Sequence, residues 1–182
     1  MSLTQYYTAT SLDGFIADER HSLDWLFTRD QDRGGPLNYD AFYAGVGAVA
    51  MGSTTYEWIL DHEGDSGWPY DVPAWVFTHR ELREIPGAQV TFTSGDVRDV
   101  HEGMTQAAGD RNVWIVGGGD LAGQFADAGL LDQVIVYVAP VTLGSGAPLL
   151  PRRVELRLEE TARNGDFVTA RYAVVSARAE GA

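Results

Sequence analysis

Three consecutive glycines, Gly117, Gly118 and Gly119, separate the apolar run "VWIV" from the segment "DLAGQFADAG". The apolar run predicts a buried strand, and the segment after it has the spacing of a helix. Backbone N–H groups at a helix N-terminus attract anions, and glycines let a phosphate approach them closely. A tight strand-to-helix turn without any ligand would need the same glycines. On this stretch alone, both interpretations stay open.

A second junction between a strand and a helix carries residues of the same kind. The strand "AVAM" meets Gly52, and Ser53 or Thr54 is expected to cap a helix that runs through "TYEWILDHE". The hydroxyl groups of Ser53, Thr54 and Thr55 can cap that helix and can also hydrogen-bond a phosphate. Capping alone would explain one such cluster. Two junctions, with "VFTHR" ending the strand between them, favour the two ends of one dinucleotide site.

An ordinary Rossmann fold does not fit these glycines. In the fingerprint G-x-G-x-x-G the third glycine would come one residue before Gly123, and the next strand would end in an acid for the ribose. Here that strand ends in Ala139-Pro140.

The elements that position the two junctions alternate along the chain. We predict strands in "LTQYYTAT", "GAVAMG", "AWVFT", "AQVTFTS", "NVWIV" and "QVIVYVAP", and helices over "YDAFYAGV" (capped by Asn38), "TYEWILDHE", "GDVRDVHEGMTQAAG" and "DLAGQFADAG". Residues 18–40 are expected to form a long loop, and Asn164-Gly165 is expected to join two alternating runs into a hairpin. The pattern is typical of an α/β fold with a mostly parallel sheet and an antiparallel edge.

Composition narrows the classes of function. The 182 residues predict a single domain over 1–182, and the net charge of −13 argues against binding nucleic acid or an anionic membrane. The lack of cysteine excludes thiolate nucleophiles and disulfides, and the four scattered histidines predict no metal site. Without a membrane-length apolar run or a signal-like N-terminus, we predict a cytoplasmic protein.

Read in order, these motifs resemble the dihydrofolate reductase-like superfamily, and within it the C-terminal reductase domain of riboflavin biosynthesis (the RibD C-terminal domain family). The segments that carry the resemblance are "TSLDGFIA", "AMGSTTYEW", "WPYDVPAWVFTHR", "VWIVGGGDLAGQFADAGLLDQVIVYVAPVTLGSGAPLL" and the terminal hairpin, which cover most of the chain. The resemblance implies a three-layer α/β/α fold with a mostly parallel central sheet. It also implies NADPH, with NADH possible, bound across the carboxyl ends of the strands.

The family pattern also implies a role for each matching residue. The pyrophosphate would lie between the two junctions, the adenosine ribose and its 2′-phosphate near "THR", and the nicotinamide against backbone atoms of the first strand and the segment after it. The residues implied as cofactor-binding are Gly52, Ser53, Thr54, Thr55, Gly117, Gly118, Gly119, Asp120 and Leu121 for the pyrophosphate, Thr78, His79 and Arg80 for the ribose, and Ala9 and Ile16 for the nicotinamide.

The chain also departs from that pattern. The family commonly has arginine where this chain has Ser53, so either Arg80 replaces the charge or the preference for NADPH over NADH is weak. The substrate motif of the riboflavin reductases is absent, and their Glu-Gly-Gly becomes Val116-Gly117-Gly118. These departures argue against the riboflavin step itself.

We therefore predict an NADPH-dependent reductase that transfers hydride to a small heterocyclic (pterin- or pyrimidine-like) or carbonyl substrate. Asp13 is the first candidate for the proton donor, although it also suits an Asp-Gly turn. Asp24 and Asp40 are weaker candidates, and Trp25, Phe27, Tyr39 and Trp68 are candidates for stacking on a flat ring. The alternative is a non-catalytic nucleotide- or ligand-binding protein on the same fold. We also predict a homodimer.

Overall fold

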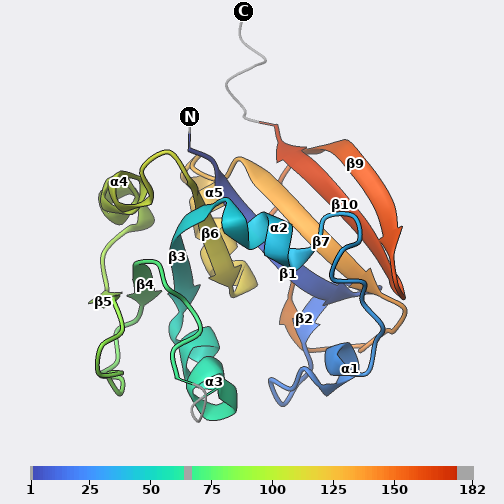
Figure 1. The fold of residues 1–182 in the computed structure, drawn as a ribbon, viewed down its shortest axis with the longest axis horizontal. Coiled ribbons are helices and arrows are strands. Elements are labelled where there is room, and N and C mark those ends of the chain that lie inside the picture. Colours follow the sequence, from blue (N-terminus) through green and yellow to red (C-terminus); the bar gives the residue numbers. More distant parts are fainter. Residues whose placement is uncertain (1, 64–66, 176–182) are drawn as a thin grey trace, which may run out of the picture.

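An eight-stranded sheet forms the centre of the computed structural model, which describes residues 2–63 and 67–175 (Figure 1). Its strand order is β5-β4-β3-β6-β1-β7-β10-β9, and all neighbouring pairs are parallel except β7–β10 and β10–β9. The strands are β1 (Thr4–Ser11), β3 (Val46–Gly52), β4 (Ala74–Phe77), β5 (Val90–Thr93), β6 (Asn112–Gly117), β7 (Gln133–Ala139), β9 (Leu156–Asn164) and β10 (Phe167–Val174).

Helices cover both faces of this sheet, which makes three layers. One apolar cluster, centred on Met104, Ile115 and Phe125, lies beneath α4 (Val97–Ala108) and α5 (Gly119–Asp127). The other includes Val49 and Tyr56 and lies beneath α2 (Tyr39–Ala44) and α3 (Ser53–Glu63). Strands buried on both faces read as continuous apolar runs, as β3 does. The predicted α/β fold with a mostly parallel sheet is confirmed.

Local signals located several of these elements correctly. The Asn38 side chain accepts a hydrogen bond from the Ala41 N–H and caps α2, and the Asp96 side chain caps α4 through the Arg98 N–H. Residues 18–40, expected as a loop, contain the short helix α1 (Asp24–Phe27) and the start of α2. A two-stranded sheet of β2 (Phe15–Ala17) and β8 (Ala147–Pro148) was also missed, because strands this short leave no alternation to detect.

The C-terminal hairpin forms as predicted, but its turn is one residue later. Asn164 is the last residue of β9, and Gly165 with Asp166 makes the turn to β10. The buried Asn164 side chain accepts from the Asp32 N–H and donates to the carbonyl groups of Asp32 and Pro36. Its long-range partners therefore keep Asn164 in the strand, and they attach the loop before α2 to the edge of the sheet.

Within residues 2–63 and 67–175, no helix combines the length and apolar character needed to cross a membrane.

Candidate functional site

Both glycine junctions lie at the same edge of the sheet. Strands β3 and β6 are parallel neighbours, and their register places Met51 opposite Gly117. Helix α3 begins at Ser53 directly after β3, and α5 begins at Gly119 with Gly118 as its N-cap residue. The two helix N-termini therefore approach one place, because parallel strands end at a common edge.

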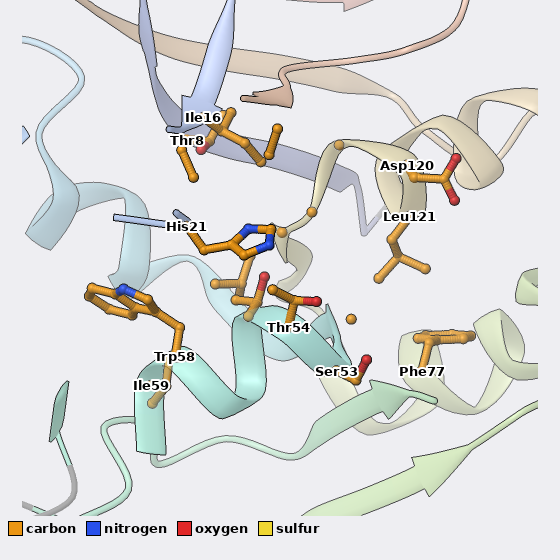
Figure 2. Close-up of a pocket in the computed structure, with 18 of the residues that line it drawn as sticks. Thr8, Ile16, His21, Ser53, Thr54, Trp58, Ile59, Phe77, Asp120 and Leu121 are labelled. Carbon is orange, nitrogen blue, oxygen red and sulfur yellow. The ribbon is translucent and has the colours of Figure 1, made fainter. Parts of the chain in front are cut away.

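A cavity of about 530 Å³ opens between these two helix starts (Figure 2). The residues lining it come from β1, β2, the segment before α1, the end of β3, α3, the segment between α3 and β4, the end of β4, the junction of β6 with α5, and β8. They are Thr8, Ile16, Ala17, His21, Leu23, Gly52, Ser53, Thr54, Thr55, Trp58, Ile59, Tyr70, Phe77, Val116, Gly117, Gly118, Gly119, Asp120, Leu121, Gln124, Ala147 and Pro148. No group of three His, Cys, Asp or Glu side chains suited to a metal ion occurs in the described part of the chain.

The glycines of the junctions differ in what a side chain would meet there. A Cβ on Gly118 would have the Ile16 Cδ1 atom, 4.0 Å away, as its neighbour, so it would project into open space. A Cβ on Gly117 would lie 3.1 Å from the Thr55 hydroxyl, and one on Gly119 would collide with the carbonyl oxygens of Pro148 and Leu149. Gly119 is thus required by the fold, whereas Gly118 leaves room beside the helix N-terminus.

Most of the implied cofactor residues meet at this cavity. The lining includes ten of them: Ile16, Gly52, Ser53, Thr54, Thr55, Gly117, Gly118, Gly119, Asp120 and Leu121. Ala9 does not line it, although its neighbour Thr8 does. Thr78, His79 and Arg80 follow Phe77, the last residue of β4, whose ring does line the cavity. Those three residues lie beyond its rim.

Arg80 is engaged by an acidic neighbour. Its guanidinium donates to both carboxylate oxygens of Glu57, at 2.7 and 3.3 Å, and both side chains are substantially exposed. Glu57 lies one turn along α3 from Ser53. Glu57 on α3 therefore partly neutralises the positive charge of Arg80. An exposed pair of this kind is weak and is screened by salt.

Asp13 lies outside the cavity and holds a loop. Its carboxylate accepts hydrogen bonds from the Ser11 hydroxyl at 2.6 Å, from the Leu143 N–H at 3.0 Å and from the Gly144 N–H at 2.7 Å. These bonds lower the pKa of Asp13 to about 2, and the bond from Ser11 contributes most. The carboxyl group is therefore ionised near neutral pH and faces no cavity space. This geometry matches the turn interpretation and does not suit a proton donor.

The cavity contains a different acid, Asp120, in the first turn of α5. Its carboxylate accepts from the Gln124 amide at 2.9 Å and from the Arg152 guanidinium at 2.8 Å, and these bonds lower its pKa. Arg152 also bonds Asp127 at 2.8 Å. Two carboxylates therefore neutralise the charge of the Arg152 guanidinium beside the second junction. Nothing in the pattern around "PRRVELR" indicates this contact, because 32 residues separate it from Asp120.

The aromatic side chains in the cavity are not those expected. Of the four candidates, Phe27 stacks on Trp58 at a centroid distance of 6.1 Å, and Trp25, Tyr39 and Trp68 pack elsewhere without lining the cavity. Trp58, Tyr70 and Phe77 line it instead. The spacing of Trp58 from Thr54 and Thr55 is the usable signal, since residues three or four apart share a helix face. The weaker acid candidates Asp24 and Asp40 are exposed at the starts of α1 and α2.

His21 is a lining residue that sequence reasoning missed. Its backbone has φ 59°, in the left-handed region that side chains other than glycine rarely adopt. The Asp18 carboxylate holds the turn by accepting from the N–H groups of Arg20 and Ser22, both at 2.8 Å, and the His21 N–H donates to the Asp18 carbonyl. Figure 2 shows the His21 ring reaching into the space beside Thr54.

Comparison with known families identifies the chain's relatives. Residues 4–166 match the RibD C-terminal domain. The chain belongs to this family. It is 37% identical over 174 residues to the uncharacterised protein YwjB of Bacillus subtilis, an alignment that covers 93% of this chain and 96% of YwjB.

Solved structures show the same fold. A putative riboflavin biosynthesis protein from Shewanella sp. PV-4 has a TM-score of 0.79 at 26% identity, with 96% of this chain and 99% of that chain covered. The diaminohydroxyphosphoribosylaminopyrimidine deaminase/5-amino-6-(5-phosphoribosylamino)uracil reductase from Thermotoga maritima has a TM-score of 0.66 at 16% identity, covering 96% and 57%. Dihydrofolate reductase from Enterococcus faecalis, complexed with NADP(H), has a TM-score of 0.57 at 16% identity, covering 96% and 97%. The dihydrofolate reductase-like fold is therefore confirmed.

Proposed function

We propose that this protein is an NADPH-dependent reductase, able to use NADH as well, that reduces a small heterocyclic or carbonyl compound. The observation that carries the proposal is the meeting of two glycine junctions, each opening a helix, at one cavity on the carboxyl edge of the sheet. The reductases among the family's structural neighbours support the same assignment.

The backbone that surrounds the cavity is suited to binding a dinucleotide. Gly52 and Gly118 leave space that a Cβ would fill, and the N-termini of α3 and α5 add the positive end of two helix dipoles. We propose that the pyrophosphate lies between Gly52–Thr55 and Gly117–Leu121, where the hydroxyl groups of Ser53, Thr54 and Thr55 can donate to it. When bound, the nicotinamide would supply a hydride.

The end of β4 is where we place the adenosine ribose. Phe77 lines the cavity there, and Thr78, His79 and Arg80 follow. A 2′-phosphate would compete with Glu57 for the Arg80 guanidinium. We therefore propose that the preference for NADPH over NADH is weaker than an Arg80 side chain without the Glu57 partner would provide.

The remaining lining residues prepare the reaction by position and by excluding water. Ile16, Leu23, Trp58 and Ile59 form an apolar wall beside the first helix junction. Such a wall keeps bulk water from a hydride acceptor and holds a flat ring in one orientation. The chain needs no nucleophile for this chemistry, only a path for one proton to the heteroatom of the substrate.

Calorimetric titration of NADPH and then NADH into the purified protein tests the proposal. We expect binding in the micromolar range for both, with NADPH tighter by about tenfold or less, since one partly neutralised surface charge distinguishes them. Absence of binding for both cofactors would overturn the reductase assignment. Cofactor binding without turnover on pterin, pyrimidine or quinone acceptors would favour a non-catalytic nucleotide-binding protein.

We also propose a homodimer, and we place its interface on the C-terminal hairpin. Leu156 and Leu158 on the outermost strand β9, and Val168 on β10, are exposed by 38%, 53% and 56%. Edge strands with exposed apolar side chains favour pairing with another chain. Sedimentation of the wild type as a monomer would contradict this proposal, and Leu158→Glu is expected to convert a dimer to monomers.

A further inference from the structure

The cavity extends from the glycine junctions to a second end with a different chemical character. We call this the substrate end and define it by Leu23, Trp58, Ile59 and Tyr70. The His21 ring lies between Trp58 and Thr54, where the substrate end meets the first junction (Figure 2). Figure 2 shows Trp58 and Ile59 on α3 on one side of Thr54, and Phe77, Asp120 and Leu121 on the other. A ligand on the pyrophosphate junctions would therefore leave the substrate end open to a second molecule.

The walls of the substrate end are apolar and aromatic. Trp58 is stacked against the Phe27 ring, with centroids 6.1 Å apart, and against the His62 ring, with centroids 4.1 Å apart. The Tyr70 ring lies edge-on to Trp68 and Trp114 at 5.2 and 5.7 Å. Rings supported in this way present a flat, fixed surface at little cost in conformational entropy, which suits a planar heterocycle.

Apart from His21, whose ring the heterocycle would engage, no lining side chain there can carry a positive charge for a phosphate group. Among the described lining residues there is no arginine, the chain has no lysine, and the acid Asp120 lies at the other end with Arg152 as its partner. A phosphate bound against apolar rings would lose its hydration without gaining a charge partner. The substrate end therefore disfavours a phosphorylated ligand, in contrast to the glycine junctions.

His21 is the polar group that projects into this space. The Asp18 turn holds it with a left-handed backbone, a conformation that costs free energy for a residue other than glycine. Its ring makes no hydrogen bond to any residue that the structure describes, so both ring nitrogens are free to bind a ligand. Imidazole can donate a hydrogen bond and, when protonated, a proton.

We propose that the substrate of this protein is a flat heterocycle without a phosphate group, and that His21 binds its ring nitrogen or carbonyl oxygen and donates the proton. This proposal rests on the reductase function proposed above. The carbon of a C=N bond accepts the hydride with its two electrons, the π electrons of that bond move to nitrogen, and nitrogen takes a proton from the protonated His21 ring. The neutral ring then regains a proton from water.

Matched pairs of ligands test the class of substrate. Dihydroneopterin and riboflavin are each compared with their monophosphates by quenching of tryptophan fluorescence, with saturating NADP⁺ and again without it. We expect each free ring to bind at least about tenfold more tightly than its phosphate. Trp58→Phe, which keeps the stacking surface, should retain binding but lose most of the quenching. Tighter binding of the phosphates, or no binding of either free ring, would overturn the proposal.

The role of His21 is tested separately by turnover of dihydroneopterin with NADPH. His21→Asn keeps a residue that tolerates the left-handed backbone but cannot donate a proton, so turnover should fall on the order of 10²-fold while the Kd of the ring changes little. Arg20→Gln, in the same turn and outside the cavity, is the matched control and should behave like the wild type. Equal turnover of His21→Asn and the control would remove His21 from the reaction. NADPH binding is measured for the same proteins. If the wild type does not bind NADPH, the reductase proposal itself fails, whatever the role of His21.

Discussion

Adding one methyl group at Gly118 is expected to block the cofactor without disturbing the protein. The backbone there has φ −89° and ψ −176°, an extended conformation open to any residue, and the added Cβ would lie 4.0 Å from the Ile16 Cδ1 atom, an ordinary contact. The methyl group would occupy the space through which a phosphate reaches the N–H groups that open α5.

The size of the effect follows from the hydrogen bonds that would be lost. Losing one or two charge-assisted bonds between backbone N–H groups and a phosphate costs about 1.5–3 kcal/mol each. That range corresponds to Kd rising by roughly 10- to 100-fold or more for NADPH in Gly118→Ala. Gly118→Val, with a branched side chain, should abolish binding.

Two other glycines serve as controls for this experiment. Gly103→Ala lies on α4, where the new Cβ meets nothing within 4 Å, so cofactor affinity should be unchanged and stability equal or slightly higher. Gly119→Ala should instead destabilise the fold, because its Cβ would collide with two carbonyl oxygens. Calorimetry measures the affinities, and thermal unfolding shows that each variant is folded. A folded Gly118→Ala that binds NADPH like the wild type would refute the cradle at this junction.

Three further predictions concern the surroundings of the cavity. Arg80→Ala should weaken the binding of NADPH more than that of NADH, and Glu57→Gln should strengthen the binding of NADPH alone, because it releases Arg80. Equal changes in the dissociation constants of the two cofactors would place Arg80 away from the 2′-phosphate. Asp13→Asn should remove an acid-dependent part of stability. The pKa of about 2 in the folded protein lies below the ordinary value of 3.8, so the ionised carboxylate stabilises the fold above about pH 4 and this contribution is lost as the pH falls toward 2. Urea unfolding of the wild type and Asp13→Asn at pH 3 and pH 6 measures the contribution. If the two proteins differ in free energy of unfolding by the same amount at both pH values, the prediction is wrong. Asn164→Ala should lower the free energy of unfolding by roughly 2–4 kcal/mol, because it removes a buried amide that hydrogen-bonds Asp32, Pro36 and the buried Tyr137 hydroxyl. Thr161→Ala, on the exposed part of the same strand, should change it little.

Patterns of neighbouring residues predicted the parts of the site that depend on local structure. An apolar run that ends in glycine before a helical segment determines a strand, a turn and a helix start, because each depends on residues only a few positions apart. Two such units in a parallel sheet must end at one edge. Gly52, Gly118 and their neighbours could therefore be placed together before any tertiary contact was known.

Other roles depend on partners far away in the chain, and only the tertiary structure decided them. Asp13 could be a proton donor or a turn residue until the N–H groups of Leu143 and Gly144 were seen to hold it. Asn164 reads as a turn residue but is kept in its strand by Asp32 and Pro36.

The sequence alone therefore determined the glycine junctions and the type of fold, since both follow from spacing along the chain. The tertiary structure decided which side chains share the cavity with those junctions. His21 has no periodic or motif signal, and it reaches the cavity because the Asp18 turn directs it there. Trp58 lines the cavity because α3 follows β3 directly, and β3 ends at the same edge of the sheet as β6. Contacts of this kind arise from packing between distant segments, which local patterns do not encode.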